Sequence, residues 1–161
     1  NMRLTEIQAA ILIEQLKKLD WIIEWRQASV NHLEKDISIP AIEWFKTRNN
    51  STHTYYVHGG LWDKRKANGL HRNKFIEAVK AELAPLKGRE IDGVPISCGY
   101  IKPIYRFPIF NIQKPICPNC EELYNEKLFL HRFIGYPTMY EDSNNIIKAF
   151  NKVWENREEI K

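Results

Sequence analysis

The sequence lacks a disulfide framework, a membrane span and a strong excess of charge of one sign. Its three cysteines among 161 residues are few and odd in number, which suits a reducing compartment. The apolar run near its start, residues 7–13, contains Gln8 and ends before Glu14, far short of the roughly 20 apolar residues of a membrane helix. Basic, apolar and small-residue segments do not open the chain in the order of a secretory signal. We therefore expect a cytoplasmic protein with no membrane association.

Positive charge is only slightly in excess, with 24 Lys and Arg against 20 Asp and Glu and a formal net charge of +4. Nucleic-acid-binding modules usually concentrate basic residues more strongly. The compact basic cluster at residues 64–66, after Trp62, is therefore interpreted as a solvated turn after a strand, with nucleic-acid binding as the less favoured alternative. A chain of this length with 43% hydrophobic residues supports one buried core, so we expect a single domain over residues 1–161.

The first part of the chain predicts one long amphipathic helix over residues 1–37. Neither glycine nor proline occurs before Pro40, and Thr5 with Gln8 three residues later forms a capping-box pattern. Apolar residues recur at steps of three, four and seven: Leu12, Leu16, Leu19, Ile23, Val30, Leu33 and Ile37. The five consecutive apolar residues 9–13 encircle the helix, so we expect another domain or subunit to cover that turn.

The middle of the chain predicts few strands and a second helix. Residues 52–58 are rich in β-branched and aromatic side chains, which predicts a strand that stops at Gly59 and Gly60. Apolar spacing predicts a helix over residues 72–83, and Pro85 forbids its continuation. The proline-rich stretch 93–112 is expected to form a short strand and irregular loop, shaped for a ligand or partner.

A last amphipathic helix is predicted over residues 142–154. Asp142 and Ser143 are its expected caps, and Pro137 precedes them. Because strands and helices do not alternate regularly, the pattern indicates an α+β fold in which helices pack on one face of a small antiparallel sheet.

A Cys-Pro-Asn-Cys motif at residues 117–120 has the spacing that can grip zinc or exchange disulfides. It supplies only half of a tetrahedral zinc site, and Cys98 and His131 lack the second tight pair. A redox pair of the thioredoxin type sits where a strand meets the start of a helix, which is not predicted here. We therefore expect neither a metal site nor a redox role.

The histidines do not form a catalytic constellation in the sequence. We expect His32 to be exposed on the long helix and His71 to lie at a helix entrance. His53 and His58 flank the predicted strand on opposite faces, so only one of them can face a given site. With no Gly-rich phosphate loop and no nucleophile elbow, the residues alone indicate an α+β domain without a complete active site.

The opening sequence NMRLTEIQAA, continued by QLKKLD at residues 15–20, resembles the C-terminal half of DegT/StrS-type sugar aminotransferases. These enzymes have the aspartate-aminotransferase fold (fold type I) and use pyridoxal 5'-phosphate (PLP). Similar blocks follow in the same order, and the resemblance spans nearly the whole chain. They comprise His53–Val57, Arg72, Gly99–Tyr105, Pro108 and the last helix.

The resemblance implies a homodimer, joined through the long helix, in which each subunit completes the other's site. Asn1 would donate hydrogen bonds to the PLP phosphate of the neighbouring subunit, and Arg3 would either assist it or form a structural salt bridge. His53, Tyr100 and Tyr105 are the substrate-side candidates, with core packing of the two tyrosines as the alternative. Many family members have His where Tyr105 stands, so the exact substrate is open.

The resemblance also implies that the chain contains no catalytic residue, because the Schiff-base lysine and the aspartate that pairs with the cofactor lie upstream in the family. We expect residues 1–161 to be the small C-terminal domain, with 1–37 leaving a missing PLP-binding domain. The start at Asn1 rather than Met also indicates a fragment. Alone, the chain is expected to be inactive.

The expected activity of the intact enzyme is transfer of an amino group from an amino-acid donor to a keto sugar nucleotide, for amino-sugar and surface-polysaccharide synthesis. The alternative is a non-catalytic dimerisation or regulatory domain left from a split aminotransferase gene. The sequence does not decide between them.

Overall fold

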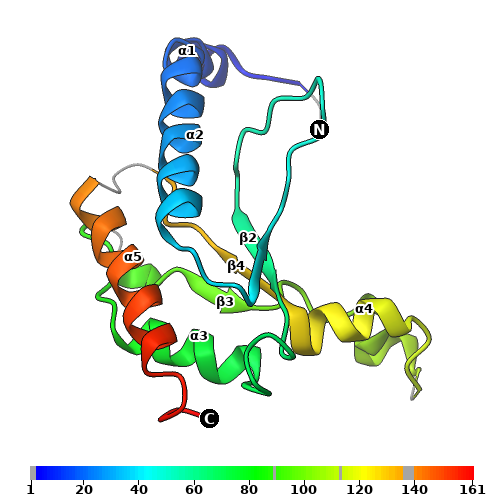
Figure 1. Ribbon diagram of the computed structural model, residues 1–161. Coiled ribbons are helices and arrows are strands. Elements are labelled where there is room, and N and C mark those ends of the chain that lie inside the picture. The colour runs from blue at the N-terminus through cyan, green and yellow to red at the C-terminus, as the bar shows by residue number, and fades with distance from the viewer. Residues whose placement is uncertain (1–2, 89, 113, 136–139) are drawn as a thin grey trace.

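The computed structural model describes residues 3–88, 90–112, 114–135 and 140–161. Within these ranges, helices cover one face of a four-stranded sheet, which confirms the predicted α+β class (Figure 1). Two residues of the sequence analysis, Asn1 and Pro137, lie outside the described ranges. In the described part, every helix is either too short or too polar to cross a membrane.

The sheet is antiparallel throughout and has the strand order β1-β2-β4-β3. Its register pairs His58 with His131 and Gly60 with Phe129 in the two central strands. Paired residues share a face of the sheet, and the His58, His131 and Phe129 side chains point toward the helices, where His58 contacts Glu34 of α2 and Phe129 lies against Phe150 of α5. The strands are β1 (Ile42–Trp44), β2 (His58–Trp62), β3 (Ile96–Cys98) and β4 (Leu128–His131).

The predicted strand over residues 52–58 is wrong, because β2 begins at His58 and runs straight through Gly59 and Gly60. The two glycines are in the middle of a ladder, where the neighbouring strands approach closely. A Cβ atom on Gly59 would lie 2.2 Å from the carbonyl oxygen of Phe129, a distance that no side chain tolerates. The glycines therefore permit strand packing here and do not mark a turn.

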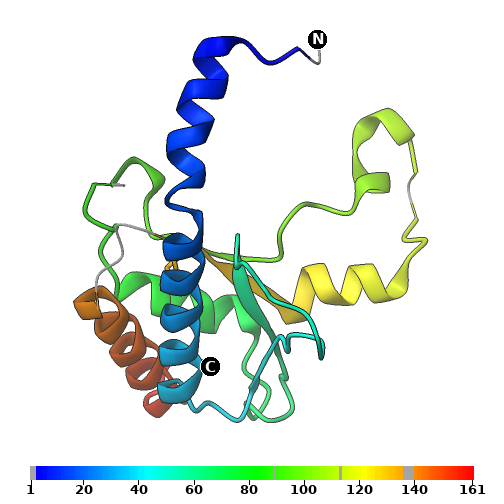
Figure 2. The ribbon, with the colours of Figure 1, turned by 90° about the horizontal axis from the view of Figure 1, so that it is seen from above.

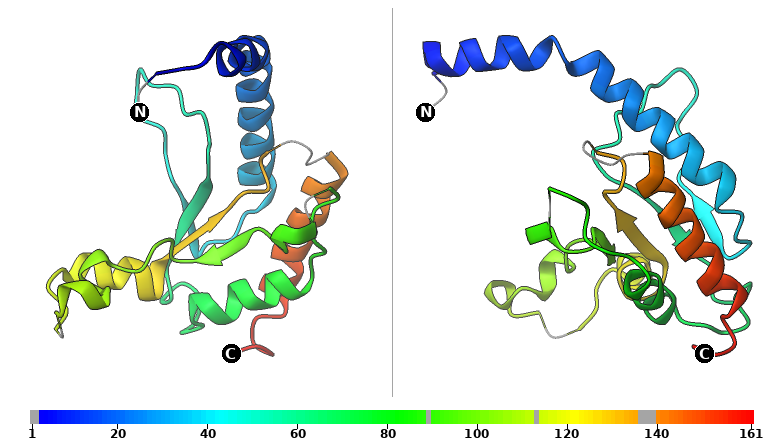
Figure 3. Two further views of the ribbon diagram at one scale, coloured as in Figure 1. Left: turned by 180° about the vertical axis from the view of Figure 1, so that it is seen from behind. Right: turned by 90° about the vertical axis from the view of Figure 1, so that its left-hand side faces the viewer.

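The predicted long helix is broken into α1 (Glu6–Leu16) and α2 (Leu19–Asp36). The capping box is confirmed: Thr5 Oγ1 accepts from the Gln8 amide, and Gln8 Oε1 accepts from the Thr5 amide. At the break, the Lys18 amide donates to the Gln15 carbonyl, a tighter step than that of an α-helix. Only α2 is anchored in the core, through Val30 and Leu33, whereas α1 buries no residue. The chain changes direction between α1 and α2 (Figure 3).

Three helices pack on the sheet: α2, α3 (Arg72–Ala81) and α5 (Tyr140–Glu155) (Figures 1 and 3). The predicted second and last helices are thus confirmed, with different ends. Since α5 begins at Tyr140, Asp142 and Ser143 lie inside its first turns and are not its caps. The largest fully buried side chains of the core include Trp62, Phe75, Phe129, Phe133, Phe150 and Leu33.

A long excursion between β3 and β4 leaves the body of the domain on the side away from these helices (Figure 2). We call residues 100–127 the arm. The stretch 93–112 forms β3 and irregular turns, as predicted. The described part of the arm comprises η2 (Ile104–Arg106), η3 (Pro108–Phe110), α4 (Pro118–Glu122) and the π-turn η4 (Leu123–Lys127).

Candidate functional site

The predicted cofactor residues lie at the very start of the chain. Arg3 is exposed just before α1, and Asn1 lies outside the described residues. Their proposed contact with a phosphate therefore depends on how α1 is placed against a neighbouring subunit. Helix α1, which follows Arg3, has no buried residue.

His53 lies in the segment between β1 and β2 and is exposed. Its ring stacks on Tyr55 with ring centres 4.2 Å apart, and its Nδ1 accepts a hydrogen bond from the Tyr55 amide at 2.9 Å. Helix α2 holds this segment, since Gln27 Nε2 donates to the His53 carbonyl and Arg26 donates to the Thr54 carbonyl. The imidazole is thus fixed in orientation with its ring open to solvent.

The two predicted tyrosines lie in the arm and differ in environment. Tyr100 is 59% exposed, whereas Tyr105 is 7% exposed and donates its hydroxyl to Glu121 Oε1. Burial and that hydrogen bond raise the pKa of Tyr105 to about 12. Arg106 pairs with the same carboxylate, and Asn125 Nδ2 donates to it at 3.1 Å. The Tyr105 hydroxyl is therefore held by a residue of the arm itself. His53 belongs to a different segment, the one between β1 and β2.

The arm is fastened at its base by Arg72, the first residue of α3. This guanidinium is 2% exposed and donates to a series of main-chain carbonyls in η4 and at the start of β4. Two of these bonds, to Tyr124 at 3.0 Å and to Leu128 at 2.6 Å, come from Nη1. The Gly99 amide donates to the same Leu128 carbonyl. The resemblance marked Arg72 only as the start of a helix, and its role as an anchor was missed.

Sequence reasoning also missed a buried polar chain that links α2 to the sheet. His58 Nδ1 lies 2.9 Å from His131 Nε2, and His58 Nε2 lies 2.9 Å from Glu34 Oε1. The Phe133 amide donates to His131 Nδ1 at 3.4 Å. Because His131 Nδ1 accepts, His131 donates through Nε2 to His58, which in turn donates to Glu34.

Burial keeps both of these histidines neutral. It lowers the pKa of His58 to about 4, with positive charge at His53 adding to the effect. Burial and the neighbouring His58 hold the pKa of His131 well below its usual range, and burial raises the pKa of Glu34. A different histidine, His32 of α2, was expected to be exposed. It is instead half-buried between Asp36 at 3.2 Å and Asn144 at 3.1 Å.

The structure does not bring together the residues of the possible zinc site, which are Cys98, Cys117, Cys120 and His131. In the described ranges, no three His, Cys, Asp or Glu side chains are placed to hold a metal ion. His131 is committed to the buried chain, and Cys98 lies half-buried in β3. Cys117 and Cys120 are exposed on the arm. Cys117 is the N-cap residue of α4, and Cys120 lies in the first turn of that helix.

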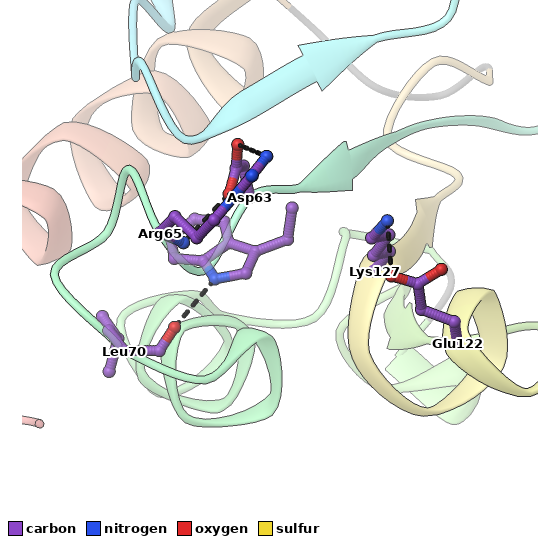
Figure 4. A network of polar contacts seen from close by, with 6 residues as sticks. Asp63, Arg65, Leu70, Glu122 and Lys127 are labelled. Atoms are coloured by element: carbon purple, nitrogen blue, oxygen red, sulfur yellow. Dashed lines mark hydrogen bonds and ion pairs between the residues drawn. The ribbon is translucent and has the colours of Figure 1, made fainter.

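A cavity of about 680 Å³ lies beside the basic cluster, between the 63–69 turn and the end of the arm. Two ion pairs lie in its lining, Arg65 with Asp63 at 3.3 Å and Lys127 with Glu122 at 2.7 Å (Figure 4). The Trp62 indole donates to the Leu70 carbonyl at 2.9 Å and closes the turn. The turn predicted after the strand is confirmed.

The described residues do not form a complete PLP site. A lysine that binds the cofactor covalently must stand in a sheltered pocket, and every described lysine except Lys127 is exposed. Lys127 is half-buried and paired with Glu122.

The comparisons with known proteins point to one family. The sequence model of the DegT/DnrJ/EryC1/StrS aminotransferase family matches residues 1–151. A curated relative from Micromonospora echinospora, described as an L-glutamine:3-amino-2,3-dideoxy-scyllo-inosose aminotransferase, is 30% identical over 136 residues. That match covers 80% of this chain and 29% of the relative.

Solved structures of aminotransferases share the fold of this chain at low sequence identity. Helicobacter pylori PseC, an aminotransferase of pseudoaminic acid biosynthesis, has a TM-score of 0.69 at 18% identity over 96% of this chain and 38% of its own. An aminotransferase from Psychrobacter cryohalolentis has a TM-score of 0.68 at 17% identity, over 97% of this chain and 40% of its own. The chain thus spans well under half the length of the relatives it matches.

Proposed function

The chain belongs to the DegT/DnrJ/EryC1/StrS aminotransferase family, and from that membership we propose that it is the small C-terminal domain of a sugar aminotransferase. The intact enzyme would transfer an amino group from an amino-acid donor to a keto sugar nucleotide, in the cytoplasm, for surface-polysaccharide synthesis. The family implies PLP as its cofactor. The observation that carries the proposal is the family match over residues 1–151, which covers nearly the whole chain.

We assign the covalent chemistry to a PLP-binding domain outside this chain. Supporting this, the lysines of the described residues are exposed or, at Lys127, paired with a carboxylate. The chain alone is therefore expected to be inactive. Its own contribution would be Asn1 and, at the same end, Arg3, both directed at the cofactor phosphate of the neighbouring subunit.

The long helical segment is the proposed dimer contact. Helix α1 has no buried residue, and the apolar side chains of α1 and early α2 are strongly exposed. Such a continuous apolar surface is unfavourable in water and is typical of an interface. The exposed apolar residues of this surface are Ile7, Ile11, Leu12, Ile13, Leu16, Leu19 and Trp21.

His53, Tyr100 and Tyr105 are proposed to form one wall of the sugar pocket. The exposed imidazole of His53 and the exposed phenol of Tyr100 are available for hydrogen bonds to sugar hydroxyls or phosphate. Tyr105 would act by shaping the arm, because its hydroxyl is already donated to Glu121.

A second candidate is a stand-alone dimerisation or regulatory domain. It is favoured by the complete core of the described residues and by the lack of a sheltered, unpaired lysine among them. The two candidates differ in whether a PLP-binding domain accompanies this chain in the cell.

Activity reconstituted in trans tests the proposal. The chain is assayed alone and together with the separately produced domain encoded upstream in its gene, using PLP, L-glutamine and a nucleotide-linked keto sugar. Mass spectrometry follows the aminated product. We expect no product from the chain alone and turnover from the pair. Arg3→Ala should weaken the pair, whereas Arg48→Ala, at another exposed arginine, should not. Product formed by the chain alone would refute the assignment.

A further inference from the structure

The Cys-Pro-Asn-Cys motif of the arm has a structural setting that the sequence did not predict. Cys117 is the N-cap residue of α4, Pro118 is its first residue, and Cys120 follows in the first turn. Both thiols are free and exposed. The proposed function uses neither of them, and the described residues offer them no set of metal ligands.

The local backbone places the two cysteines at opposite ends of one helical turn. The Glu121 amide donates to the Cys117 carbonyl at 3.0 Å, so the first turn of α4 closes directly over the motif. Residues three apart on a helix have Cβ atoms about 5–6 Å apart. A disulfide needs about 3.5–4.5 Å between Cβ atoms. Cys117 has φ −127° and ψ 85°, outside the helical region, so the helix does not fix its backbone, and we assign the remaining approach to rotation at this N-cap residue.

The third cysteine provides an internal contrast. Cys98 lies half-buried in β3, far along the chain from the pair. Burial raises the pKa of its thiol, against the opposing influence of Arg72. A thiol that is sheltered and harder to ionise reacts more slowly than an exposed one. Oxidation of this chain should therefore occur first at Cys117 and Cys120, the two cysteines of the arm.

From this arrangement we propose that Cys117 and Cys120 form a reversible intramolecular disulfide by exchange with a small disulfide such as oxidised glutathione. The thiolate of one cysteine attacks a glutathione sulfur, which breaks the glutathione disulfide and releases one glutathione thiolate. The thiolate of the second cysteine then attacks the mixed disulfide and releases the other glutathione. The two cysteines together lose two electrons and two protons, and oxidised glutathione gains them.

The disulfide would change the position of a neighbouring polar cluster, formed by Glu121, Tyr105 and Arg106. Glu121 follows Cys120 directly and holds both the Tyr105 hydroxyl and the Arg106 guanidinium. A ring closed across the first turn of α4 would fix that turn and so the position of the Glu121 backbone. If Tyr105 shapes the sugar pocket, oxidation would alter substrate binding; this consequence rests on the proposed function, but the disulfide does not.

A redox titration of the full chain tests the inference. The protein is equilibrated at a series of ratios of reduced to oxidised glutathione and quenched with acid. Free thiols are then labelled with a maleimide under denaturing conditions, and intact mass is measured. We expect one transition, in which two thiols become unlabelled together while one label remains on Cys98. The transition should not depend on protein concentration.

Three variants identify the sulfurs involved. Cys98→Ser should keep the transition, whereas Cys117→Ser and Cys120→Ser should each abolish it. Both arm cysteines are exposed, so these two variants should fold like the parent, and their circular dichroism spectra check this. Labelling of all three thiols at every ratio would overturn the inference. So would glutathione adducts that never resolve, or disulfides found only between chains.

Discussion

Acidification from pH 7 to pH 4 should destabilise the fold by about 3 kcal/mol through His58 alone. This side chain is 3% exposed, and burial lowers its pKa from 6.5 to about 4. One pKa unit corresponds to about 1.4 kcal/mol, which gives about 3 kcal/mol over this range.

The sign follows from which state binds the proton. The unfolded chain takes up a proton near pH 6.5, whereas folded His58 resists it until about pH 4. Stability is therefore complete above pH 6.5 and is lost as pH falls toward 4. His131, with its pKa also lowered, acts in the same direction. Glu34 acts in the opposite direction and offsets part of the loss, because its pKa is raised in the fold.

Urea unfolding at pH values from 7.5 to 4, followed by tryptophan fluorescence, measures this effect. Trp44 stacks on His58 with ring centres 5.0 Å apart and reports on the site directly. His58→Phe keeps a ring in the stack and removes one proton site, so it should be less stable at pH 7 but lose less stability on acidification. His71→Asn removes a histidine outside the cluster and retains an N-cap side chain for α3, so it should keep the parent's pH dependence. An equal loss of stability in the parent and in His58→Phe would refute the reasoning.

Three further predictions follow from the packing and the exposed helix. Gly59→Ala should cost more than about 3 kcal/mol in thermal unfolding, because its Cβ would clash with a carbonyl oxygen, whereas Gly69→Ala, strained only by φ +88°, should cost about 1 kcal/mol. Arg72→Met should cost about 3 kcal/mol or more in urea unfolding and speed amide exchange at the base of the arm, whereas the exposed Arg65→Met should change stability by less than about 0.5 kcal/mol. Ile7→Glu should shift the chain from dimer to monomer in analytical ultracentrifugation without loss of helix content, and an unchanged dimer would contradict the proposed interface.

The helices of this fold are predictable because their signals are local. The last helix shows its buried face in the spacing of Ile146, Phe150 and Val153, and the capping box at Thr5 lies within four residues. The break after Leu16 was not predictable, since the apolar pattern continues across it. It depends on which part of the helix the core holds.

The sequence did not predict the course of β2, the buried chain of His58 and His131, or the contacts of Arg72. Each depends on residues that are far apart in the sequence. Gly59 and Gly60 looked like a turn, and only the approach of β1 and β4 on either side makes glycine necessary there. His58 and His131 are separated by 73 residues and meet only through the strand register. Arg72 reaches its carbonyls across more than 50 residues. The resemblance to the family nominated His53, Tyr100 and Tyr105, whereas the contacts that hold the arm depend on the fold.

The reading frame upstream of the Asn1 codon tests the central claim most directly. The claim is that this chain is the small domain of an aminotransferase whose cofactor domain precedes it. The account predicts an open frame, continuous with this one, that encodes a domain with a lysine in a PLP-binding context. A stop codon followed by a ribosome-binding site before Met2 would contradict the account, because the domain would then be made alone.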